Sequence, residues 1–401
     1  MPDPPPSPPA ARGHRLGRNI VALGLVSFFT DMSSEMIYPL LPVFLTVTLG
    51  ASAAFVGAIE GAAESVSALL KLASGWWSDR VHARKPFVLT GYVIASVTRP
   101  LIAIAQSAGQ VLAIRVTDRV GKGLRSSPRD ALIADSVDPA IRGRAFGFQR
   151  AWDNAGAVAG PLIAFVLLQW DGMTMRHVFW LALVPGALAV ATVVWGVREV
   201  PRQTARSGAP LDLSQPMGGR FWAFMAVIFV FTLGNSTDAF LLLRAKQLGV
   251  PLALTPIIWA LLNAVKSLTN TPGGALSDRV GRRPTLVIGW LFYAGVYFAF
   301  ARASQQWHAW ALFAVYGIYF GFTEGAERAL VSDIVPAERR GTAFGWFNLA
   351  VGLGALPASL IFGVIWDRVG AGAAFTLGGS LALLAAVGIV LVGKARPAAA
   401  G

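Results

Sequence analysis

The sequence contains no cysteine, which excludes disulfide bonds, thiolate metal sites and cysteine nucleophiles. Histidine is also rare, and its few copies lie far apart in the chain, at His14, His82, His177 and His308. A histidine-based metal site is therefore not expected. We expect the chain to work with no bound metal and no cofactor.

Charged residues are scarce as well. They make up 14% of the 401 residues, whereas soluble domains carry roughly 25%, and 55% of the residues are apolar. The net charge of +13 would fit nucleic-acid binding. Most basic residues, however, fall in alternate connections between apolar stretches, which is the pattern of inner-membrane proteins. We therefore expect no nucleic-acid partner.

Motifs of the common catalytic and nucleotide-binding sites are missing. The sequence has no H-E-x-x-H, no G-x-S-x-G and no G-x-x-x-x-G-K-[ST]. These absences argue against an intramembrane enzyme and against ATP as the energy source. We expect no enzymatic activity and no catalytic residues. A channel or a receptor that transports nothing is a further alternative.

Long apolar stretches recur along the whole chain. A helix needs about 20 mostly apolar residues to cross a bilayer core. Such stretches occur at 20–47, 53–77, 87–107, 111–133, 145–168, 178–197, 221–243, 254–276, 285–301, 307–331, 343–365 and 374–392. The sequence therefore predicts an all-α membrane protein with twelve transmembrane helices.

The basic residues also predict the orientation of the chain. They gather at both termini, in the central connection and in the connections after the second and eighth spans. Because cytoplasmic loops carry an excess of lysine and arginine, both termini are predicted to face the cytoplasm, in the inner (plasma) membrane. The predicted domains are a disordered Pro-rich cytoplasmic tail at 1–18, a six-helix bundle at 19–197, a cytoplasmic linker at 198–220, a second six-helix bundle at 221–393 and a cytoplasmic tail at 394–401.

The two halves of the chain repeat each other in three places. GWWSDRVHARK (75–85) recurs as GALSDRVGRRP (274–284), ADSVDPAIRGRAFGF (134–148) recurs as SDIVPAERRGTAFGW (332–346), and SSE (33–35) lies over STD (236–238). Matched charges and glycines in separate segments are not explained by apolar composition alone. Such half-chain repeats are typical of transporters that build a binding site at the midplane between two bundles.

The repeated loop, with the pattern G-x-x-x-D-R-x-x-x-R, resembles the loop motif of the major facilitator superfamily (MFS). The resemblance covers essentially the whole chain and implies two pseudo-symmetric six-helix bundles that rock around a central site. It also implies a gating role for the loop residues, as a latch on the cytoplasmic surface. These residues are Gly75, Asp79, Arg80 and Arg84 in the first half and Gly274, Asp278, Arg279 and Arg283 in the second.

Two further segments are similar to motifs of the same superfamily. Arg115, with Asp135 and Arg142-Gly143 after it, follows the spacing of the fourth-helix motif, although Arg119 replaces a usual glycine. Gly147, Gly156 and Gly160-Pro161 resemble the antiporter motif of drug–proton exchangers, whose trailing glycine pair is replaced here by Ala164 and Phe165. Glycines four residues apart permit close helix packing, and a proline lets a helix bend. Gly156, Gly160 and Pro161 are therefore predicted to belong to the conformational machinery.

Ionisable residues inside the predicted spans are costly in a bilayer and usually mark a pathway. Carboxylates of the first two spans are predicted to face a stripe of cations on the fourth, which recur at helical spacing. Such rows can relay protons, because a change of arginine contact changes the proton affinity of a carboxylate. A static salt-bridge network is the alternative. The predicted proton-coupling residues are Asp31, Glu35, Glu60, Glu64 and Arg115, and the predicted substrate-binding residues are Arg119, Lys122, Arg125, Asp238, Lys266 and Glu324.

These patterns together predict a secondary active transporter that moves a small organic solute by alternating access. The resemblance favours proton-coupled efflux by antiport; proton-coupled uptake of an organic anion or nutrient by symport is the alternative. The cations of the fourth span slightly favour an anionic or zwitterionic solute over a cation. The expected partners are the solute, protons and the lipid bilayer, and the chain is expected to function as a monomer.

Overall fold

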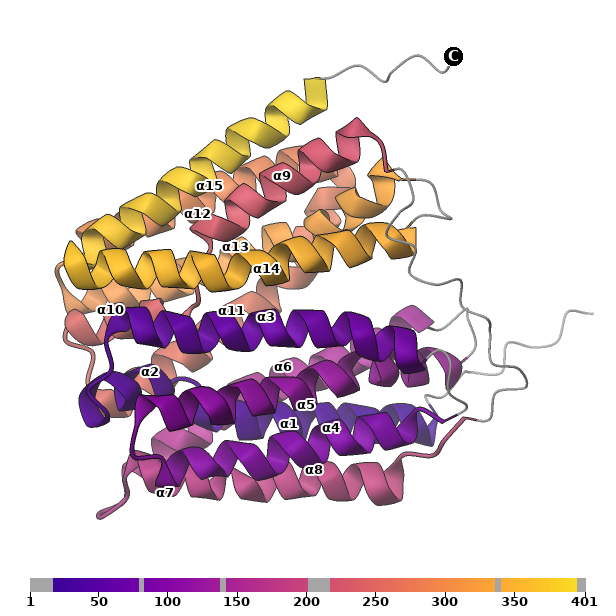
Figure 1. Cartoon of the computed structure of the whole chain (residues 1–401), viewed down its shortest axis with the longest axis vertical. Coiled ribbons are helices and arrows are strands. Elements are labelled where there is room, and N and C mark those ends of the chain that lie inside the picture. The colour runs from indigo at the N-terminus through magenta and orange to yellow at the C-terminus, as the bar shows by residue number, and fades with distance from the viewer. Residues whose placement is uncertain (1–16, 79–82, 138–141, 201–216, 336–339, 395–401) are drawn as a thin grey trace, which may run out of the picture.

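The computed structural model describes residues 17–78, 83–137, 142–200, 217–335 and 340–394. Within these ranges every regular element is a helix (Figure 1). The first half holds α1 (Arg18–Ile37), α2 (Leu41–Val43), η1 (Phe44–Thr48), α3 (Ala53–Ser78), α4 (Lys85–Thr98), η2 (Arg99–Ile104), α5 (Ala108–Asp135), α6 (Arg142–Leu168), α7 (Met175–Leu181) and α8 (Leu183–Gly196). The second half holds α9 (Gly219–Gly234), α10 (Ala239–Gln247), η4 (Leu252–Leu254), α11 (Thr255–Val280), α12 (Arg282–Arg302), α13 (Gln306–Ile334), α14 (Arg340–Arg368) and α15 (Ala371–Lys394).

The long helices lie side by side, so the bundle has two ends (Figure 1). We call the end that carries Arg18 and Lys394 the terminal end. The opposite end, where η1 leads into α3 and α14 leads into α15, is the distal end.

Among the residues that the structure describes, ten helical segments are long and apolar enough to cross a membrane, by length and composition. They coincide with ten of the twelve predicted spans, so these ten predictions are confirmed. The other two predicted spans fall on α5 and α13, which are as long as their neighbours, with 28 and 29 residues. Charged side chains along α5 lower its hydropathy, which explains why α5 lacks the apolar signal of a span.

The helix pairings in the first half recur in the second. α1 packs against α6 and α8, and α5 packs against α3 and α4; correspondingly, α9 packs against α14 and α15, and α13 packs against α11 and α12. The two halves meet through α3 against α14 and through α11 against α6. The sequence repeat thus corresponds to a repeat of helix packing.

Glycines allow α3 and α14 to approach each other closely between the halves. A Cβ atom on Gly57 would lie 2.2 Å from the carbonyl oxygen of Ser359, and one on Gly61 would lie 2.8 Å from the Cα atom of Leu356. Near the distal end, a Cβ atom on Gly363 would lie 2.5 Å from the Cα atom of Ala54. These distances are shorter than carbon contacts allow, so larger side chains would force the halves apart.

Helix breaks differ between the halves. Pro39 and Pro42 lie at the break between α1 and α2, as expected for residues that cannot continue a helix. In the second half the break comes earlier, between α9 and α10, and residues 235–238 carry no proline. Asp238 stands at the N-cap of α10, so the second half has non-helical backbone at a level where α1 is still helical.

Candidate functional site

A cavity of about 550 Å³ lies between the two halves. In the first half its wall is formed by α1, α3, η2 and α5, and in the second by α9, α11, α13, α14 and the 235–238 break. Every predicted proton-coupling residue lines it. So do the predicted substrate-binding residues except Glu324, whose side chain lies outside the described part of the structure.

A buried ion pair between Glu60 of α3 and Arg115 of α5 forms part of the cavity wall. The Arg115 guanidinium donates from Nε to Glu60 Oε1 at 2.9 Å and from Nη2 to Glu60 Oε2 at 2.7 Å. Both side chains are buried, with 4% and 7% of their surface exposed. Two parallel bonds fix the orientation of both groups and neutralise their charges. This pair is therefore a rigid part of the wall, and neither charge is available to a solute while the pair holds.

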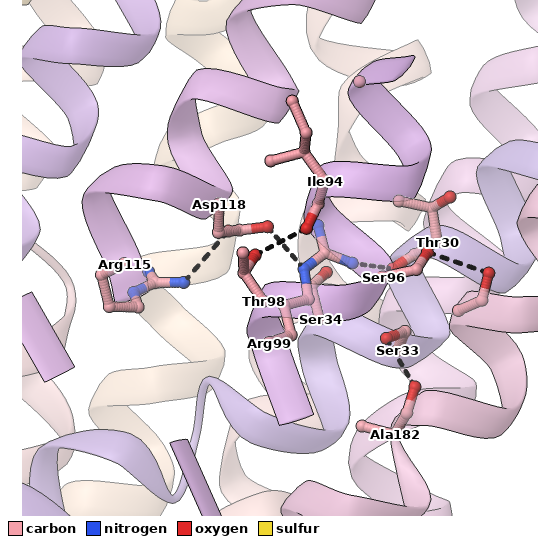
Figure 2. A network of polar contacts seen from close by, with 12 residues as sticks. Thr30, Ser33, Ser34, Ile94, Ser96, Thr98, Arg99, Arg115, Asp118 and Ala182 are labelled. Carbon is pink, nitrogen blue, oxygen red and sulfur yellow. Dashed lines mark hydrogen bonds and ion pairs between the residues drawn. The ribbon is translucent and has the colours of Figure 1, made fainter. Parts of the chain in front are cut away.

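A second ionic contact continues the network towards α1. Arg99, at the start of η2, donates from Nε to Asp118 Oδ1 at 2.8 Å and from Nη1 to the backbone oxygen of Thr30 at 3.0 Å (Figure 2). Asp118 Oδ2 lies 3.6 Å from Arg115 Nη1, which joins this contact to the Glu60 pair. Arg99 also lines the cavity, although it is not among the site residues predicted from the sequence. An arginine within an otherwise apolar predicted span was the available signal.

Two cations on α5 face the cavity differently from Arg115. Arg119 lines the cavity, and its buried Nε atom has no hydrogen-bond partner among the described residues. Lys122 lies one turn further along and also lines the cavity, as does the Glu64 carboxylate of α3. These groups are the ones placed to exchange partners with a solute or with each other.

Arg125 lines the cavity too, but it packs towards α4. Its guanidinium carbon lies 4.4 Å from the centre of the Tyr92 ring, and only 5% of the residue is exposed. Arg129, one turn on, pairs with Asp130 at 2.9 Å. The cation stripe predicted from spacing thus turns gradually away from the cavity towards the terminal end of α5.

Glu35 connects the two halves across the cavity. Trp259 of α11 donates from Nε1 to Glu35 Oε2 at 2.6 Å. The Trp259 ring also packs against Tyr38, with ring centres 4.9 Å apart. A carboxylate of the first half is therefore held by an indole of the second, and this contact must change if the halves move relative to each other.

The wall of the second half combines aromatic rings with polar side chains. Phe231, Trp259, Tyr319 and Phe320 line the cavity. Asp238 accepts a hydrogen bond from the Tyr316 hydroxyl at 2.9 Å, and Lys266 Nζ lies 4.0 Å from the centre of the Phe320 ring. No local sequence motif predicts this group of rings, because they come from three separate helices, α9, α11 and α13.

The glycines of the antiporter-like motif pack α6 against α1. A Cβ atom on Gly156 would lie 2.4 Å from the Phe28 carbonyl oxygen. One on Gly160 would lie 2.6 Å from the Met32 carbonyl oxygen and 3.0 Å from the Glu35 Cβ atom. Pro161 lies inside α6, which continues to Leu168. The motif thus places α6 directly behind the α1 residues that line the cavity.

The loop motif can be followed only in part. Asp79 and Arg80 lie outside the described residues, and Gly274 and Asp278 lie within α11, where only their backbone is described. Gly75 packs near Ser127 of α5, and Arg279 and Arg283 lie at the α11–α12 connection. The gating role of this motif stays a prediction.

A paired contact does recur beside the loop motif. Arg84 pairs with Asp135 in the first half, and Arg282 Nε lies 2.6 Å from Asp333 Oδ2 in the second. Asp135 and Asp333 are 198 positions apart, as are Arg84 and Arg282. The structural equivalent of Arg84 is therefore Arg282, one position before the residue that the loop alignment selects, because the offset changes between the two repeated segments.

The halves are also joined at the distal end. Asp367, near the end of α14, accepts hydrogen bonds from the backbone N–H groups of Ala53 at 3.0 Å and Ala54 at 2.8 Å. These are the first residues of α3, whose N-terminal N–H groups have no partner within the helix. A carboxylate of the second half therefore caps a helix of the first.

Comparisons with known proteins agree with this architecture. The family model of the Major Facilitator Superfamily matches residues 23–356 and 260–401. An MFS-type transporter of Methanocaldococcus jannaschii is 33% identical over 395 residues, covering 94% of this chain and 95% of its own. A probable 4-methylmuconolactone transporter of Cupriavidus pinatubonensis and the multidrug resistance protein MdtH of Cronobacter sakazakii are each 27% identical, cover 80% of this chain, and are matched over 77% and 79% of their own lengths.

Solved structures show the same fold at low sequence identity. A bacterial homologue of the human lysosomal transporter Spinster, in an inward-facing and occupied conformation, aligns with a TM-score of 0.77 at 19% identity over 96% of this chain and 100% of that one. The nucleoside transporter NupG aligns with a TM-score of 0.75 at 15% identity over 94% and 99%. The chain therefore belongs to the Major Facilitator Superfamily and is a multi-pass membrane transporter of small solutes, not an enzyme.

Proposed function

We propose that this chain is a proton-coupled antiporter that exports a small organic solute from the cytoplasm. The observation that carries the proposal is the hydrogen bond from Trp259 to Glu35, in which an indole of the second half binds a carboxylate of the first. If the halves rock, the hydrogen bond to Glu35 is made in one conformation and lost in another. The affinity of Glu35 for a proton then differs between the two, which is the requirement for coupling.

The other predicted coupling residues have complementary places in this scheme. Glu64 of α3 lines the cavity together with Lys122 and Arg119 of α5. Glu60 and Arg115 form the fixed pair. We propose that Asp31, Glu35 and Glu64, which all line the cavity, exchange protons while the Glu60–Arg115 pair stays formed.

Two facts favour export over uptake. The α6 segment resembles the antiporter motif, and the MdtH relative is a multidrug resistance protein. Proton-coupled uptake of an organic anion is the second candidate, because another relative is named as a probable transporter of 4-methylmuconolactone.

Transport in reconstituted vesicles with an imposed pH gradient tests the proposal. Candidate solutes would be screened in both directions, and Glu35→Gln, Glu60→Gln and Glu64→Gln would be compared with the wild type. Glutamine keeps the shape of the side chain and removes its titration. Asp130→Asn is the matched control, because Asp130 is half exposed and pairs with Arg129 away from the cavity. Unchanged pH-driven transport in all three glutamate variants would rule out this coupling scheme.

The charge of the solute can be tested on the same protein. We propose that an anionic or zwitterionic solute binds near Arg119, Lys122 and Arg125, opposite Lys266. Lys122→Gln or Arg125→Gln should then weaken solute binding in detergent more than Asp238→Asn or Glu324→Gln does. The reverse order would identify a cationic solute.

The proposed membrane arrangement is twelve spans, with α5 and α13 completing the ten apolar ones, as two six-helix bundles in the inner membrane of a cell. We propose that both termini and the 198–220 connection face the cytoplasm and that the monomer is the working unit. Reporter fusions at Gly208, outside the described residues, and at Gly109 should report opposite sides of the membrane. Reporters on the same side would overturn the arrangement.

A further inference from the structure

In the first half, a carboxylate binds the N-terminus of α4 at the terminal end. Glu199, which follows α8, accepts a hydrogen bond at Oε1 from the backbone N–H of Arg84 at 3.0 Å and one at Oε2 from that of Lys85 at 2.7 Å. The first N–H groups of a helix have no partner within the helix, and the helix dipole stabilises an anion there. The start of α4 is thus an anion site, for which the chain itself supplies the anion.

The equivalent helix of the second half, α12, differs in the acidic residues near its start. Arg282 is the structural equivalent of Arg84, as their ion pairs show, and the first turn of α12 contains no acidic residue. The residue 198 positions after Glu199 is Pro397, and residues 395–401 contain no aspartate or glutamate. The segment that supplies the anion to α4 therefore has no acidic counterpart among the residues that follow α15.

A pocket of about 450 Å³ lies beside the first residues of α12. Arg282 and Arg283 line it from α12, Arg220 lines it from the start of α9, and Asp333 lines it from α13. Asp333 Oδ2 lies 2.6 Å from Arg282 Nε. Three arginines and one aspartate are the charged residues among the described lining, so the pocket carries a net positive charge.

The pocket lies at the level of a membrane surface. Trp222, near the start of α9, is 44% exposed, and tryptophans are enriched at the level of lipid head groups. Arg220, two residues earlier, is exposed as well. Leu330 and Ile334 of α13 add apolar side chains to the lining. Arginine pairs with phosphate through two parallel hydrogen bonds, so this lining matches a phosphate group with or without carbon atoms attached to it.

We propose that the pocket lined by Arg220, Arg282 and Arg283 binds a phosphate group, which takes the place that the Glu199 carboxylate has at the start of α4. The phosphate belongs to the head group of an anionic phospholipid or to a soluble phosphate, and the arginines and the helix N-terminus recognise the same chemistry in both. The pocket shares no lining residue with the central cavity. The inference is therefore independent of the proton coupling and the direction of transport proposed above.

Native mass spectrometry of the full chain in detergent tests the site, with dioleoyl phosphatidylglycerol as the probe. Arg220→Gln and Arg283→Gln should each weaken binding of the first lipid about fivefold, the contribution of one basic residue near a membrane surface. Arg302→Gln is the matched control, because it removes an exposed arginine from the other end of α12, and it should bind lipid as the wild type does. Arg220 is exposed, so Arg220→Gln should fold, which a thermal melt would verify.

Inorganic phosphate distinguishes the two sources of the phosphate group. If it displaces the lipid and raises the unfolding midpoint of the wild type but not of Arg220→Gln, the ligand is a soluble phosphate. If it does neither, while both pocket variants lose lipid, the ligand is a lipid head group. Either result supports the site. Equal lipid binding by the wild type and both pocket variants, with no effect of phosphate, would overturn it, and so would an equal loss of lipid in Arg302→Gln.

Discussion

The two halves of this transporter share helix pairings but line the central cavity with different chemistry. The first half contributes ion pairs on continuous helices, such as Glu60 with Arg115. The second half contributes aromatic rings, a broken helix between α9 and α10, and neutral partners such as the Tyr316 hydroxyl on Asp238. The two copies of the bundle thus share their helix packing, while the first lines the cavity with paired charges and the second with aromatic rings and polar side chains.

This comparison predicts its largest effect where a buried charge loses the partner that binds it through two hydrogen bonds. Glu60→Gln leaves the Arg115 guanidinium buried with a neutral amide, and removal of one member of a buried ion pair costs about 3–5 kcal/mol. Asp238→Asn in the second half removes a carboxylate bonded to a neutral hydroxyl, which is worth about 1 kcal/mol. The thermal unfolding midpoint in detergent should therefore fall far more for Glu60→Gln.

The double variant Glu60→Gln/Arg115→Met serves as the control for this interpretation. With both charges removed, much of the lost stability should return, because no unpaired charge stays buried. If Glu60→Gln and Asp238→Asn lowered the unfolding midpoint equally, the carboxylates of the two walls would not differ in how strongly their partners stabilise the fold.

The second prediction concerns equivalent glycines, Gly156 of α6 and Gly354 of α14, which are 198 positions apart. A Cβ atom on Gly156 would meet the backbone oxygen of Phe28 at 2.4 Å, whereas one on Gly354 would meet the end of the Thr232 side chain at 2.7 Å. Backbone cannot yield without moving α1, but a side chain can rotate. Gly156→Ala should destabilise the protein by about 1–3 kcal/mol, and Gly354→Ala should cost less.

Gly147 is the matched control on the same helix as Gly156. A Cβ atom there meets nothing within 4 Å, so Gly147→Ala should stabilise α6 by up to about 1 kcal/mol through helix propensity. If Gly156→Ala were as well tolerated as Gly147→Ala in a thermal melt, α1 and α6 would not be packed as tightly as the structure shows.

The third prediction tests the contact at the distal end, where the Asp367 carboxylate of the second half caps α3 of the first half. Asp367→Asn weakens the cap on α3, and a cap is worth about 1 kcal/mol. If the cap is broken when the halves open at the distal end, the population of that open state should rise about fivefold. The chain has no cysteine, so spin labels on Val47→Cys and Val369→Cys, both exposed distal positions, would report the distance between halves.

A label pair that gives the same distance distribution in the wild type and in Asp367→Asn would show that this cap is made in all conformations. Ser52→Ala is a suitable comparison, because Ser52 Oγ accepts from Phe55 within the first half and does not bridge the halves.

The smallest effect is expected for the aromatic wall itself. Lys266 lies over the Phe320 ring, and such a contact contributes about 0.5–1 kcal/mol where it is partly exposed. Phe320→Leu should lower the free energy of unfolding by that amount, measured by denaturation in detergent. Phe229→Leu, at an exposed ring on α9, should change it less. A larger loss at Phe229 would contradict the assigned contact.

From the sequence alone, long apolar stretches determined the membrane class and ten of the spans, and the resemblance of the repeated loop motif indicated the superfamily. These features depend only on composition and on spacing within one stretch of sequence, so they can be recognised without knowing how the helices pack. The predicted coupling residues on α1, α3 and α5 line the cavity for the same reason: an ionisable residue in an apolar span has to face a polar interior.

Only the tertiary structure decided which charges meet. Arg99 reaches Asp118 because η2 turns its first residue towards α5, and Arg125 lies over Tyr92 while Arg119 stays in the cavity. Glu35 meets Trp259, and Asp367 meets α3, across more than two hundred residues of sequence. Sequence periodicity indicates which residues share a helix face. The rotation and depth of each helix are set by the close packing of glycines such as Gly61 and Gly160 against a neighbouring helix. That packing depends on the sequences of both helices together.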